Sequence, residues 1–484
     1  MSLTPTLTPL PPLPEGFADQ LRASLGPACV ITEADRLAPF LIEERGHFRP
    51  DATIVLTPGS TEELARAVTL CAEAGVPMVP VGGNTGLVGG AVARAGEVMI
   101  SLKRMNRILA IDPVNYTMTV EAGCVLADIQ RAAEEAGCLF PLSLGAEGSC
   151  LIGGNIAANA GGTGVLKYGN TRDLVLGLEV VLPDGEVWDG LRPLIKDNSG
   201  YSLKNLFIGS EGSLGIVTRA VLKLFPRPVQ QETALCALDS VDKVLALLSL
   251  ARRLSGDAVT MFEMMARFPF EIVCRHAEGR DPFDRPHPWY ALIQLGTPRP
   301  GTDLRAQFEA VIETAWEQGL IIDAVVAESL AQARALTQLR EKTPEAQKRA
   351  GASIKHDISV PVARFPDFVT EASAAVLALI PDAHICAFGH VGDGNVHFNI
   401  SQPEGMERAA FLSRWSEVNE AVHAVAARMQ GAISAEHGIG LLKRDELDAF
   451  RAPVETRMMR AIKQAIDPGD LMNRGKFLGR TPPA

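Results

Sequence analysis

Two Gly-Gly-Asn strings, about seventy residues apart, constrain this chain more than any other feature of its sequence. The first lies in the run 80–87 (Pro-Val-Gly-Gly-Asn-Thr-Gly-Leu), and the second opens the run 153–162 (Gly-Gly-Asn-Ile-Ala-Ala-Asn-Ala-Gly-Gly). Paired glycines let a backbone adopt positive φ and approach another group closely. Several amide N–H groups can then converge on an anion such as a pyrophosphate.

Neither string has the spacing of the better-known phosphate loops. The G-x-G-x-x-G of nicotinamide-binding helices and the G-x-x-x-x-G-K-[ST] of nucleoside triphosphatases are both absent from these runs. A single Gly-Gly pair most often only turns the chain. Two such turns around one long phosphate-bearing ligand predict a flavin dinucleotide held between two subdomains.

The composition is that of a folded protein with more than one domain. At 484 residues the chain is too long for a single core, so we expect two or three domains. Hydrophobic residues make up 47% and charged residues 21%, the profile of a globular protein. The net charge is −11 without any Lys/Arg block, which argues against a nucleic-acid partner. The longest apolar runs, such as 376–380, are too short for a transmembrane segment.

The cysteines and the N-terminus bear on the compartment. The eight cysteines include no C-x-x-C pair, which favours reduced thiols over a zinc knuckle or an iron–sulfur cluster. Residues 1–16 are rich in proline and contain no basic residue, unlike a secretory signal or a transit peptide. We therefore expect a loose tail over 1–16 and a cytoplasmic protein.

The order of predicted elements favours an α+β fold over a doubly wound parallel sheet. Ser60 and Glu63 form a capping box for a helix that ends at Gly75, and a strand over 76–81 leads into the first glycine loop. Strands over 98–102, 116–120, 178–182 and 186–188, together with a helix over 125–136, make up the following region.

A domain boundary is predicted where Pro226 and Pro228 end a strand-like run over 217–225. A more helical region follows. Its candidate helices span 241–253, 303–318 and 327–340.

His390 and His397 are predicted to meet on one face of a hairpin. Their flanks are apolar and strand-like, and a four-residue turn at 391–394 would place residue 397 opposite residue 388. His390, His397 and Asn399 would then share one face, and two imidazoles at this separation can bind a metal. Glu436 could supply a third ligand from another segment. The alternative is that these histidines are ordinary hydrogen-bonded interior residues.

Five strings resemble the motifs of a known flavoprotein superfamily, in the same order along the chain. They are 80–87, 145–150 continuing into 152–162, 208–217, 389–397 and 436–440. The superfamily is that of vanillyl-alcohol oxidase and p-cresol methylhydroxylase. Within it, the chain is most similar to the FAD-linked D-2-hydroxy acid dehydrogenases, the branch that includes D-2-hydroxyglutarate and D-lactate dehydrogenases. The resemblance covers the chain from about residue 50 to the C-terminus.

The resemblance implies a two-subdomain FAD-binding domain over 17–226, an antiparallel-sheet-plus-helices substrate domain (cap) over 227–465, and a C-terminal segment over 466–484 that packs back on the FAD domain. Some relatives attach the flavin covalently through a His directly after the paired glycines. Asn84 stands there in this chain, so we expect non-covalent FAD. The residues implied to line FAD are Val81, Gly82, Gly83, Asn84, Thr85, Gly86, Leu87, Gly145, Ser149, Gly153, Gly154, Asn155, Asn159, Ala160, Gly161, Gly162, Tyr168, Gly169, Glu211, Gly212, Ile216, Val217 and Asn473.

The resemblance also implies a divalent metal, usually zinc with cobalt or manganese as alternatives, held by His390, His397 and Glu436. His437 is implied to be the base that takes the hydroxyl proton of a D-2-hydroxy acid while a hydride passes to FAD. Asn399, on the predicted hairpin face, is expected to orient the substrate together with His437.

Arg340 and Lys355 stand where relatives grip the substrate carboxylate. The hydroxyl-bearing residue that relatives carry four positions past the Arg is Pro344 here, and Thr343 is the expected substitute. The favoured substrate is D-2-hydroxyglutarate, with D-malate as a further candidate.

Other functions are left open by the sequence. Within the same chemistry, D-lactate or glycolate could be the substrate. A metal-dependent hydrolase without flavin and a non-catalytic flavin-binding module are the alternatives from other classes. No second redox motif is present, so an electron-transfer flavoprotein, a quinone or a dye is the expected electron acceptor, or dioxygen if the pocket admits it. A homodimer is compatible with the resemblance.

Overall fold

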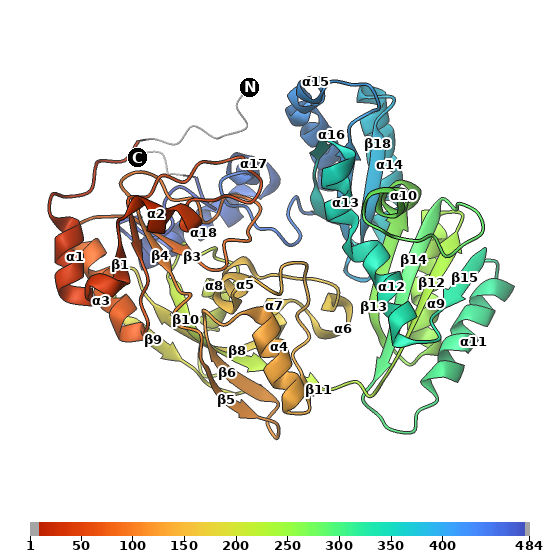
Figure 1. Cartoon of the computed structure of the whole chain (residues 1–484), viewed down its shortest axis with the longest axis horizontal. Helices are drawn as coiled ribbons and strands as arrows, with labels where there is room; N and C mark the ends of the chain where they lie inside the picture. The colour runs from red at the N-terminus through yellow and green to blue at the C-terminus, as the bar shows by residue number, and fades with distance from the viewer. Residues whose placement is uncertain (1–8, 480–484) are drawn as a thin grey trace. The chain divides into compact units, whose positions relative to one another are not determined.

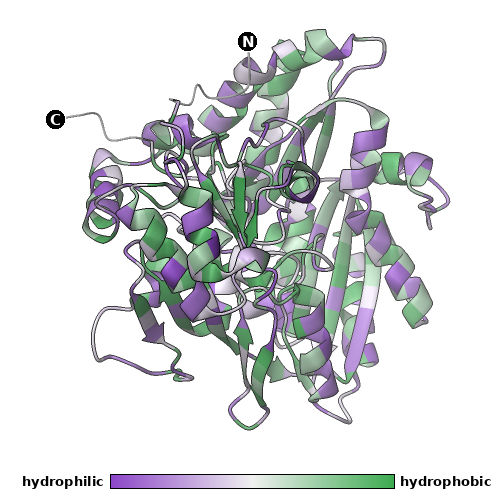
Figure 2. Ribbon diagram, turned by 60° about the vertical axis from the view of Figure 1, so that its left-hand side comes forward, coloured by the Kyte–Doolittle hydropathy of each residue, from purple (hydrophilic) through white to green (hydrophobic). Residues whose placement is uncertain are grey.

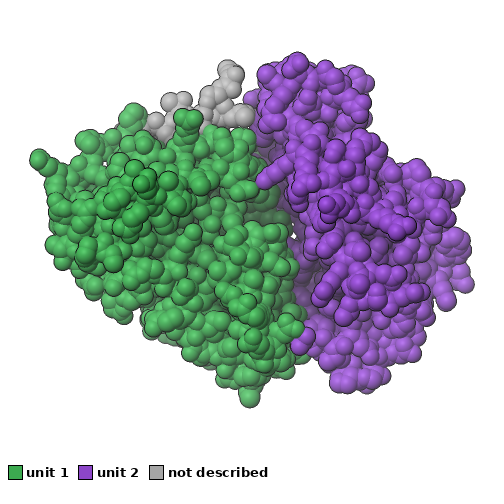
Figure 3. Space-filling view, viewed as in Figure 1, with its two compact units in different colours: residues 1–161, 169–226, 436–484 green, residues 162–168, 227–435 purple. Residues whose placement is uncertain are grey.

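The computed structural model describes residues 9–479, and its internal contacts divide the chain into two compact units (Figure 3). Among the described residues, unit 1 comprises 9–161, 169–226 and 436–479, and unit 2 comprises 162–168 and 227–435. The chain returns to unit 1 at Glu436, which is earlier than the predicted residue 466. The early return has a local cause, because the amides of Ile439 and Gly440 hydrogen-bond to Glu211 of unit 1.

Both predicted terminal segments fall partly outside the described residues, at 1–8 and 480–484. In the described part of the predicted tail, Pro11 packs against Gly96, where a Cβ would lie 2.4 Å from the Pro11 carbonyl oxygen. The expectation of a loose tail over 1–16 stays a prediction. Helix α1 (Phe17–Leu25) follows directly.

Unit 1 contains a small mixed sheet and a larger antiparallel one. In the four-stranded sheet, with the order β1-β2-β4-β3, strands β2 and β3 both run parallel to β4, and β1 is antiparallel to β2. Its strands are β1 (Val30–Ile31), β2 (Ile54–Leu56), β3 (Met78–Val81) and β4 (Val98–Ser101). The five-stranded antiparallel sheet has the order β5-β6-β10-β8-β9. Its strands are β5 (Ile108–Asp112), β6 (Thr117–Glu121), β8 (Val175–Val181), β9 (Val187–Gly190) and β10 (Ile216–Lys223).

The remaining elements of unit 1 surround these sheets (Figure 1). A short ladder joins β7 (Cys138–Leu139) to β11 (Phe225–Pro226). The other helices are α2 (Ala34–Leu37), α3 (Thr61–Glu73), α4 (Leu126–Glu135), α5 (Ile152–Ala158), α7 (Thr171–Leu174), α8 (Lys204–Phe207), α17 (Arg444–Phe450) and α18 (Pro453–Ile466), with 3-10 turns η1 (Pro27–Cys29) and η2 (Ala38–Phe40).

Unit 2 is built on one antiparallel sheet with the order β15-β12-β14-β13-β18-β19-β16, in which β17 also pairs with β19. Its strands are β12 (Gln230–Leu238), β13 (Val259–Ala266), β14 (Trp289–Thr297), β15 (Asp323–Val326), β16 (Ser353–Ile354), β17 (Asp357–Ser359), β18 (His384–His390) and β19 (Asn395–Ser401). Its helices are α6 (Val165–Tyr168), α9 (Val241–Leu254), α10 (Arg267–His276), α11 (Leu304–Glu317), α12 (Leu330–Glu341), α13 (Thr343–Ala350), α14 (Phe365–Leu379), α15 (Arg408–Ser413) and α16 (Trp415–Arg428), with 3-10 turns η3 (Val362–Arg364) and η4 (Val391–Asp393).

The α+β architecture confirms the predicted fold class. Burial of apolar residues stabilises the helices and strands, and the strands are predominantly hydrophobic in Figure 2. One hydrophobic core of unit 2 joins strands β12 to β14 and β18 with helices α10, α12 and α13. Helix α3 begins as predicted, because the Ser60 side chain accepts the amide of Glu63 at 3.2 Å. Within residues 9–479, no helix has both the length and the apolar character that a bilayer crossing requires.

The prediction of a second glycine turn is wrong, because Gly153, Gly154 and Asn155 lie inside helix α5. Glycines here serve close packing rather than a turn: a Cβ at Gly153 would lie 2.8 Å from the Ala122 Cβ. The helix ends only at Asn159, which takes the left-handed conformation with φ 50°.

Candidate functional site

The loop after β3 carries backbone amides that have no backbone acceptor within the described part of the chain. Among residues 9–479, no amide of 83–87 donates a hydrogen bond to a backbone carbonyl. Asn84 adopts φ 60°, and its Nδ2 donates to the Ile42 carbonyl at 2.6 Å. Free amides on a strongly curved loop are what a pyrophosphate requires. An amide side chain at position 84 cannot form the His–flavin link, in keeping with non-covalent FAD.

Helix α5 packs directly under this loop. A Cβ at Gly82 would lie 3.3 Å from the Gly154 Cα, so the two Gly-Gly-Asn strings touch through their glycines. A Cβ at Gly83 would lie 2.3 Å from the Ser149 carbonyl oxygen and 2.8 Å from the Cys150 Cα. Glycines therefore stand where the loop after β3 approaches the segment 149–154, because any side chain there would collide.

Two further predicted FAD segments join the same place. The amides of Gly209 and Glu211 donate to carbonyls of helix α5 at 3.0 and 2.8 Å, and a Cβ at Gly212 would meet the Pro80 ring at 2.5 Å. Asn473 Nδ2 donates to the carbonyls of Gly90 and Glu211 at 3.0 and 2.7 Å. Four segments that are distant in sequence thus converge within unit 1.

The residues of this cluster fit a bound dinucleotide. Gly86 and Gly145 have open space where a Cβ would stand, and Ser149 is exposed. The side-chain oxygens of Asn155 and Asn473 are buried, and neither has a hydrogen-bond partner among the described residues. A ligand that forms hydrogen bonds could pair with these two side-chain oxygens and with the amides of residues 83–87.

The remaining residues predicted to line FAD lie in the same segments or next to them. Half-buried positions are Thr85, Leu87, Ala160, Gly161 and Gly169; buried positions are Val81, Gly162, Ile216 and Val217. Tyr168 is half-buried in α6 and belongs to unit 2, and burial raises the pKa of its hydroxyl.

The Glu211 side chain has a role that the sequence did not indicate. Its carboxylate accepts the amides of Ile439 and Gly440 at 2.6 and 2.8 Å, and Gly438, with φ 79°, permits the close approach. Burial raises the pKa of Glu211, while the two amide hydrogen bonds oppose this shift. The Glu211 carboxylate therefore holds the loop that carries His437. The Glu211 backbone contacts the segments predicted to bind FAD, through its amide to Ala157 and its carbonyl to Asn473.

The tight fit at Gly83 gives a testable prediction. Gly83→Ala is expected to reduce the FAD content of the purified protein to below half and to cost roughly 1–3 kcal/mol of stability, because the methyl group would collide with backbone that cannot rotate away. The flavin-to-protein absorbance ratio and the Tm measure both effects. Gly90→Ala is the matched control, since its Cβ would approach only Glu211 Oε2, at 3.8 Å. An alanine at position 83 that retains full FAD would contradict the packing described above.

In unit 2, the predicted hairpin has the predicted register. Strands β18 and β19 pair Phe388 with His397 and Cys386 with Asn399, and η4 forms the turn. The rings of His390 and His397 have their centroids 5.6 Å apart. Hairpin geometry thus confirms that the two imidazoles are neighbours on one face.

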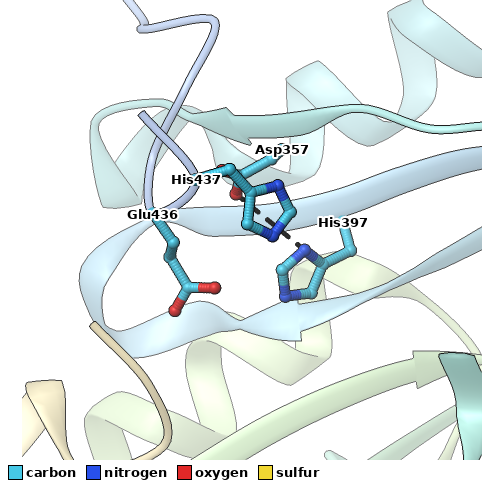
Figure 4. Close-up of side chains that lie close together, drawn as sticks. All are labelled: Asp357, His397, Glu436 and His437. Carbon is cyan, nitrogen blue, oxygen red and sulfur yellow. Dashed lines mark ion pairs between the residues drawn. The ribbon is translucent and has the colours of Figure 1, made fainter. Parts of the chain in front are cut away.

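The cluster of possible metal ligands contains Asp357, His397, Glu436 and His437 (Figure 4). One ligand atom of each lies within 4.8 Å of the others. Strand pairing places Asp357 opposite His397, and their Oδ1 and Nδ1 atoms are 3.9 Å apart. Glu436 and His437 follow Ala435, whose amide donates to the Asp357 carbonyl at 3.2 Å, so the backbone brings them beside β17. Two nitrogens and two carboxylates are a donor set that suits zinc.

His390 is not a member of that four-residue cluster. Its Nδ1 lies 2.5 Å from Glu263 Oε1, and Arg340 Nε donates to the other Glu263 oxygen at 2.7 Å. Burial raises the pKa of Glu263, but the charges and hydrogen bonds of His390 and Arg340 outweigh it and hold the pKa below its ordinary value. Glu263 is therefore an ionised, fully buried bridge between two residues that the sequence singled out.

Two predicted substrate contacts are occupied by the protein itself. Asn399 accepts the His356 amide and donates to Gln347, and its side chain is buried. Thr343 is fully buried with its hydroxyl on the Leu339 carbonyl at 3.4 Å. The Thr343 hydroxyl is thus bonded within the chain, and its substitution for the residue replaced by Pro344 stays a prediction.

Arg340 and Lys355 remain as cations for a carboxylate. Arg340 is buried over the Phe388 ring, with its guanidinium carbon 4.6 Å from the ring centroid. Lys355 lies between β16 and β17 and is half-buried. Burial raises the pKa of the Cys386 thiol, and the charges of Lys355 and Arg340 oppose this rise, so both cations lie near one thiol.

Sequence reasoning missed Asp357 and Glu263. Each is the only acid of its strand, and both are buried to 2% exposure or less. Charged residues are rarely so buried unless they are paired. A single acid within a run of mostly apolar residues, as in 259–266, is a signal that could have indicated Glu263.

Comparisons with known proteins cover nearly the whole chain. A model described as "FAD binding domain" matches residues 52–190, and one described as "FAD linked oxidases, C-terminal domain" matches residues 227–477. D-2-hydroxyglutarate dehydrogenase of Xanthomonas citri pv. viticola is 40% identical over 428 residues, 88% of this chain and 89% of that protein. The mitochondrial enzyme of that name from Bos taurus is 36% identical over 483 residues, 99% of this chain and 87% of that protein.

Solved structures show the same architecture at low identity. p-Cresol methylhydroxylase with substrate bound superimposes with a TM-score of 0.75 at 18% identity, over 96% of each chain. Alkyldihydroxyacetonephosphate synthase superimposes with a TM-score of 0.73 at 18% identity, over 97% of this chain and 87% of that one. These similarities concern the fold.

Proposed function

Because this chain belongs to the FAD-linked oxidase family and is a FAD-dependent 2-hydroxy acid dehydrogenase, we propose that it oxidises D-2-hydroxyglutarate, and also D-malate, with the help of a divalent cation. The names of the curated relatives support the substrate. The observation that carries the proposal is the cluster of Asp357, His397, Glu436 and His437, together with His390, which is paired with Glu263 and lies next to His397.

The chain offers separate groups for the cofactor and for the cation. The loop 82–87, helix α5, the 209–217 segment and Asn473 would hold FAD, which supplies hydride acceptance when bound. His390, His397 and Glu436 would hold the cation, for which zinc is the first candidate and cobalt or manganese the next. His397 and Glu436 belong to the four-residue cluster together with Asp357, an added carboxylate, and the His390 ring centroid lies 5.6 Å from that of His397. A bound divalent cation supplies a lowered hydroxyl pKa and fixes the orientation of the acid.

His437 is the proposed base for the hydroxyl proton of the substrate. An imidazole titrates near neutral pH, so its neutral form can accept a proton under working conditions. The loop that carries it is fixed by the Glu211 carboxylate through Ile439 and Gly440, which limits the movement of His437 between turnovers.

Arg340 and Lys355 are the proposed partners of the substrate carboxylates. The planar guanidinium of Arg340 suits a carboxylate, and Glu263 takes only its Nε. A monocarboxylic acid such as D-lactate has no second carboxylate to pair with the two cations. Hydrogen bonds to charged groups contribute about 1.5–3 kcal/mol, so the missing group is expected to cost roughly 10- to 100-fold in kcat/KM.

Anaerobic mixing with a panel of D- and L-2-hydroxy acids, while the bleaching of the flavin at 450 nm is followed, tests the substrate. D-2-hydroxyglutarate and D-malate are expected to give a kcat/KM at least about tenfold above that of D-lactate and glycolate. The L-acids are the control and are expected to leave the flavin oxidised. The reverse order of D-acids would replace the glutarate assignment with D-lactate or glycolate oxidation. A colourless protein that takes up no FAD would favour a hydrolase.

We also propose that an electron-transfer flavoprotein or a quinone reoxidises the flavin, because the sequence contains no second redox motif. A cytoplasmic location is proposed from the thiols. All eight cysteines are unpaired, which suits a reducing compartment.

A further inference from the structure

We infer that Glu263 is a positioning residue that sets both the tautomer of His390 and the direction of Arg340, and so couples the cation site to the carboxylate site. The inference rests on the proposed function. It concerns a side chain on a strand that carries none of the predicted site residues.

Strand pairing fixes Glu263 beside His390. The two residues are directly opposite each other in the β13–β18 ladder, so their side chains leave the same face of the sheet. All eight residues of β13 are buried, and Glu263 is the only charged one among them. A buried carboxylate is costly and is often replaced without loss by apolar residues when its role is only structural. Its presence here favours a role in the site.

The Glu263–His390 contact decides which imidazole nitrogen carries the proton when the ring is neutral. An ionised carboxylate only accepts hydrogen bonds, so the 2.5 Å contact places the His390 proton on Nδ1. In the neutral ring the lone pair is then on Nε2, the atom that would bind a cation. Carboxylates on the far nitrogen of a ligand histidine commonly fix the tautomer and raise the basicity of the ligand.

The second Glu263 oxygen acts on Arg340. It accepts Nε–H at 2.7 Å, and the guanidinium is held over Phe388. This leaves the terminal amino groups of Arg340 to face a substrate carboxylate in a bidentate way. One carboxylate therefore orients a proposed metal ligand and a proposed substrate ligand.

Glu263→Gln tests the coupling, because glutamine keeps one acceptor oxygen and replaces the other with an N–H donor. If the amide N–H of glutamine faces His390, it donates to Nδ1, so the imidazole proton moves to Nε2 and this nitrogen has no lone pair left for the cation. If the amide N–H faces Arg340, it repels the Nε–H donor. The metal-free variant, titrated with Co²⁺ and followed by visible absorption, is expected to bind roughly 10- to 100-fold more weakly than wild type. Its KM for D-2-hydroxyglutarate is expected to rise, with FAD content unchanged.

Glu179→Gln is the matched control. Glu179 is another buried carboxylate paired with an arginine, with Arg219 Nη1 at 3.3 Å, but it lies in the five-stranded sheet of unit 1. It is expected to lose stability and to keep wild-type Co²⁺ affinity. If Glu263→Gln does not fold, Glu263→Asp keeps the charge but retracts it by one methylene, and it is also expected to weaken Co²⁺ binding.

The outcomes separate this inference from the proposed function. Wild-type Co²⁺ binding together with unchanged affinity in a folded Glu263 variant would overturn the role of Glu263 alone. Equal losses of affinity in the Glu263 and Glu179 variants would also overturn it, because the effect would then be general destabilisation. Absence of Co²⁺ binding in wild type would overturn the proposed metal and this inference together.

Discussion

Replacing His437 with alanine is expected to slow flavin reduction by D-2-hydroxyglutarate about 10²- to 10⁴-fold, the usual contribution of a general base. The imidazole is the group we assign to the hydroxyl proton, and without it the proton must leave to water. Stopped-flow absorbance at 450 nm under anaerobic conditions measures the rate. The FAD content is expected to remain that of wild type, since His437 is not among the residues that we expect to hold FAD.

His384→Ala is the matched control for this variant. His384 lies at the start of β18, stacked on Phe268 with ring centroids 4.6 Å apart, and its loss is expected to leave the rate within twofold. Because His437 also belongs to the four-residue cluster, the metal content of the alanine variant separates two roles. Retained metal with a lost rate supports the base, whereas lost metal would make His437 a ligand. An unchanged rate would remove it from the reaction.

Stripping the enzyme with a chelator is expected to lower kcat at least about 100-fold while the flavin spectrum persists. Polarisation of the substrate by a divalent ion contributes several kcal/mol, and each 1.4 kcal/mol is a factor of ten. Adding back Zn²⁺, Co²⁺ or Mn²⁺ is expected to restore turnover. Metal analysis of the stripped and restored protein, alongside steady-state rates, measures the effect.

His397→Ala gives the same test without a chelator. It is expected to lose both metal and turnover, because His397 is the one histidine of the predicted ligand pair that also belongs to the four-residue cluster. His276→Ala, at the end of α10, is a control outside the cluster and is expected to retain both. Full activity in the metal-free enzyme would contradict the proposed cation and leave the flavin chemistry intact.

The sequence was most informative where the geometry is local. A four-residue turn is enough to define the register of β18 and β19, so the proximity of His390 and His397 followed from the spacing of the residues. The capping of α3 by Ser60 is equally local. Patterns of this kind depend on neighbours within a few residues, which a sequence displays directly.

Contacts between distant segments were beyond sequence reasoning. Glu263 lies 127 residues before His390, and only the order of strands in the sheet brings them together. The helical state of Gly153 and Gly154 was missed for a related reason. Glycine has a low helix propensity, and tertiary packing against Ala122 and Gly82 overrides it.

The discontinuous path of unit 1 has a consequence for biosynthesis. Met78 of β3 bridges Met472, and the Asn473 amide donates to the Met78 carbonyl at 2.8 Å, so β3 is completed by a segment that is made much later. At about 5–20 residues per second, a ribosome needs on the order of 20–80 s to advance from one partner to the other. During that interval unit 2 can fold as an insert, and the FAD cluster of unit 1 is complete only after the segment around Asn473 has been made.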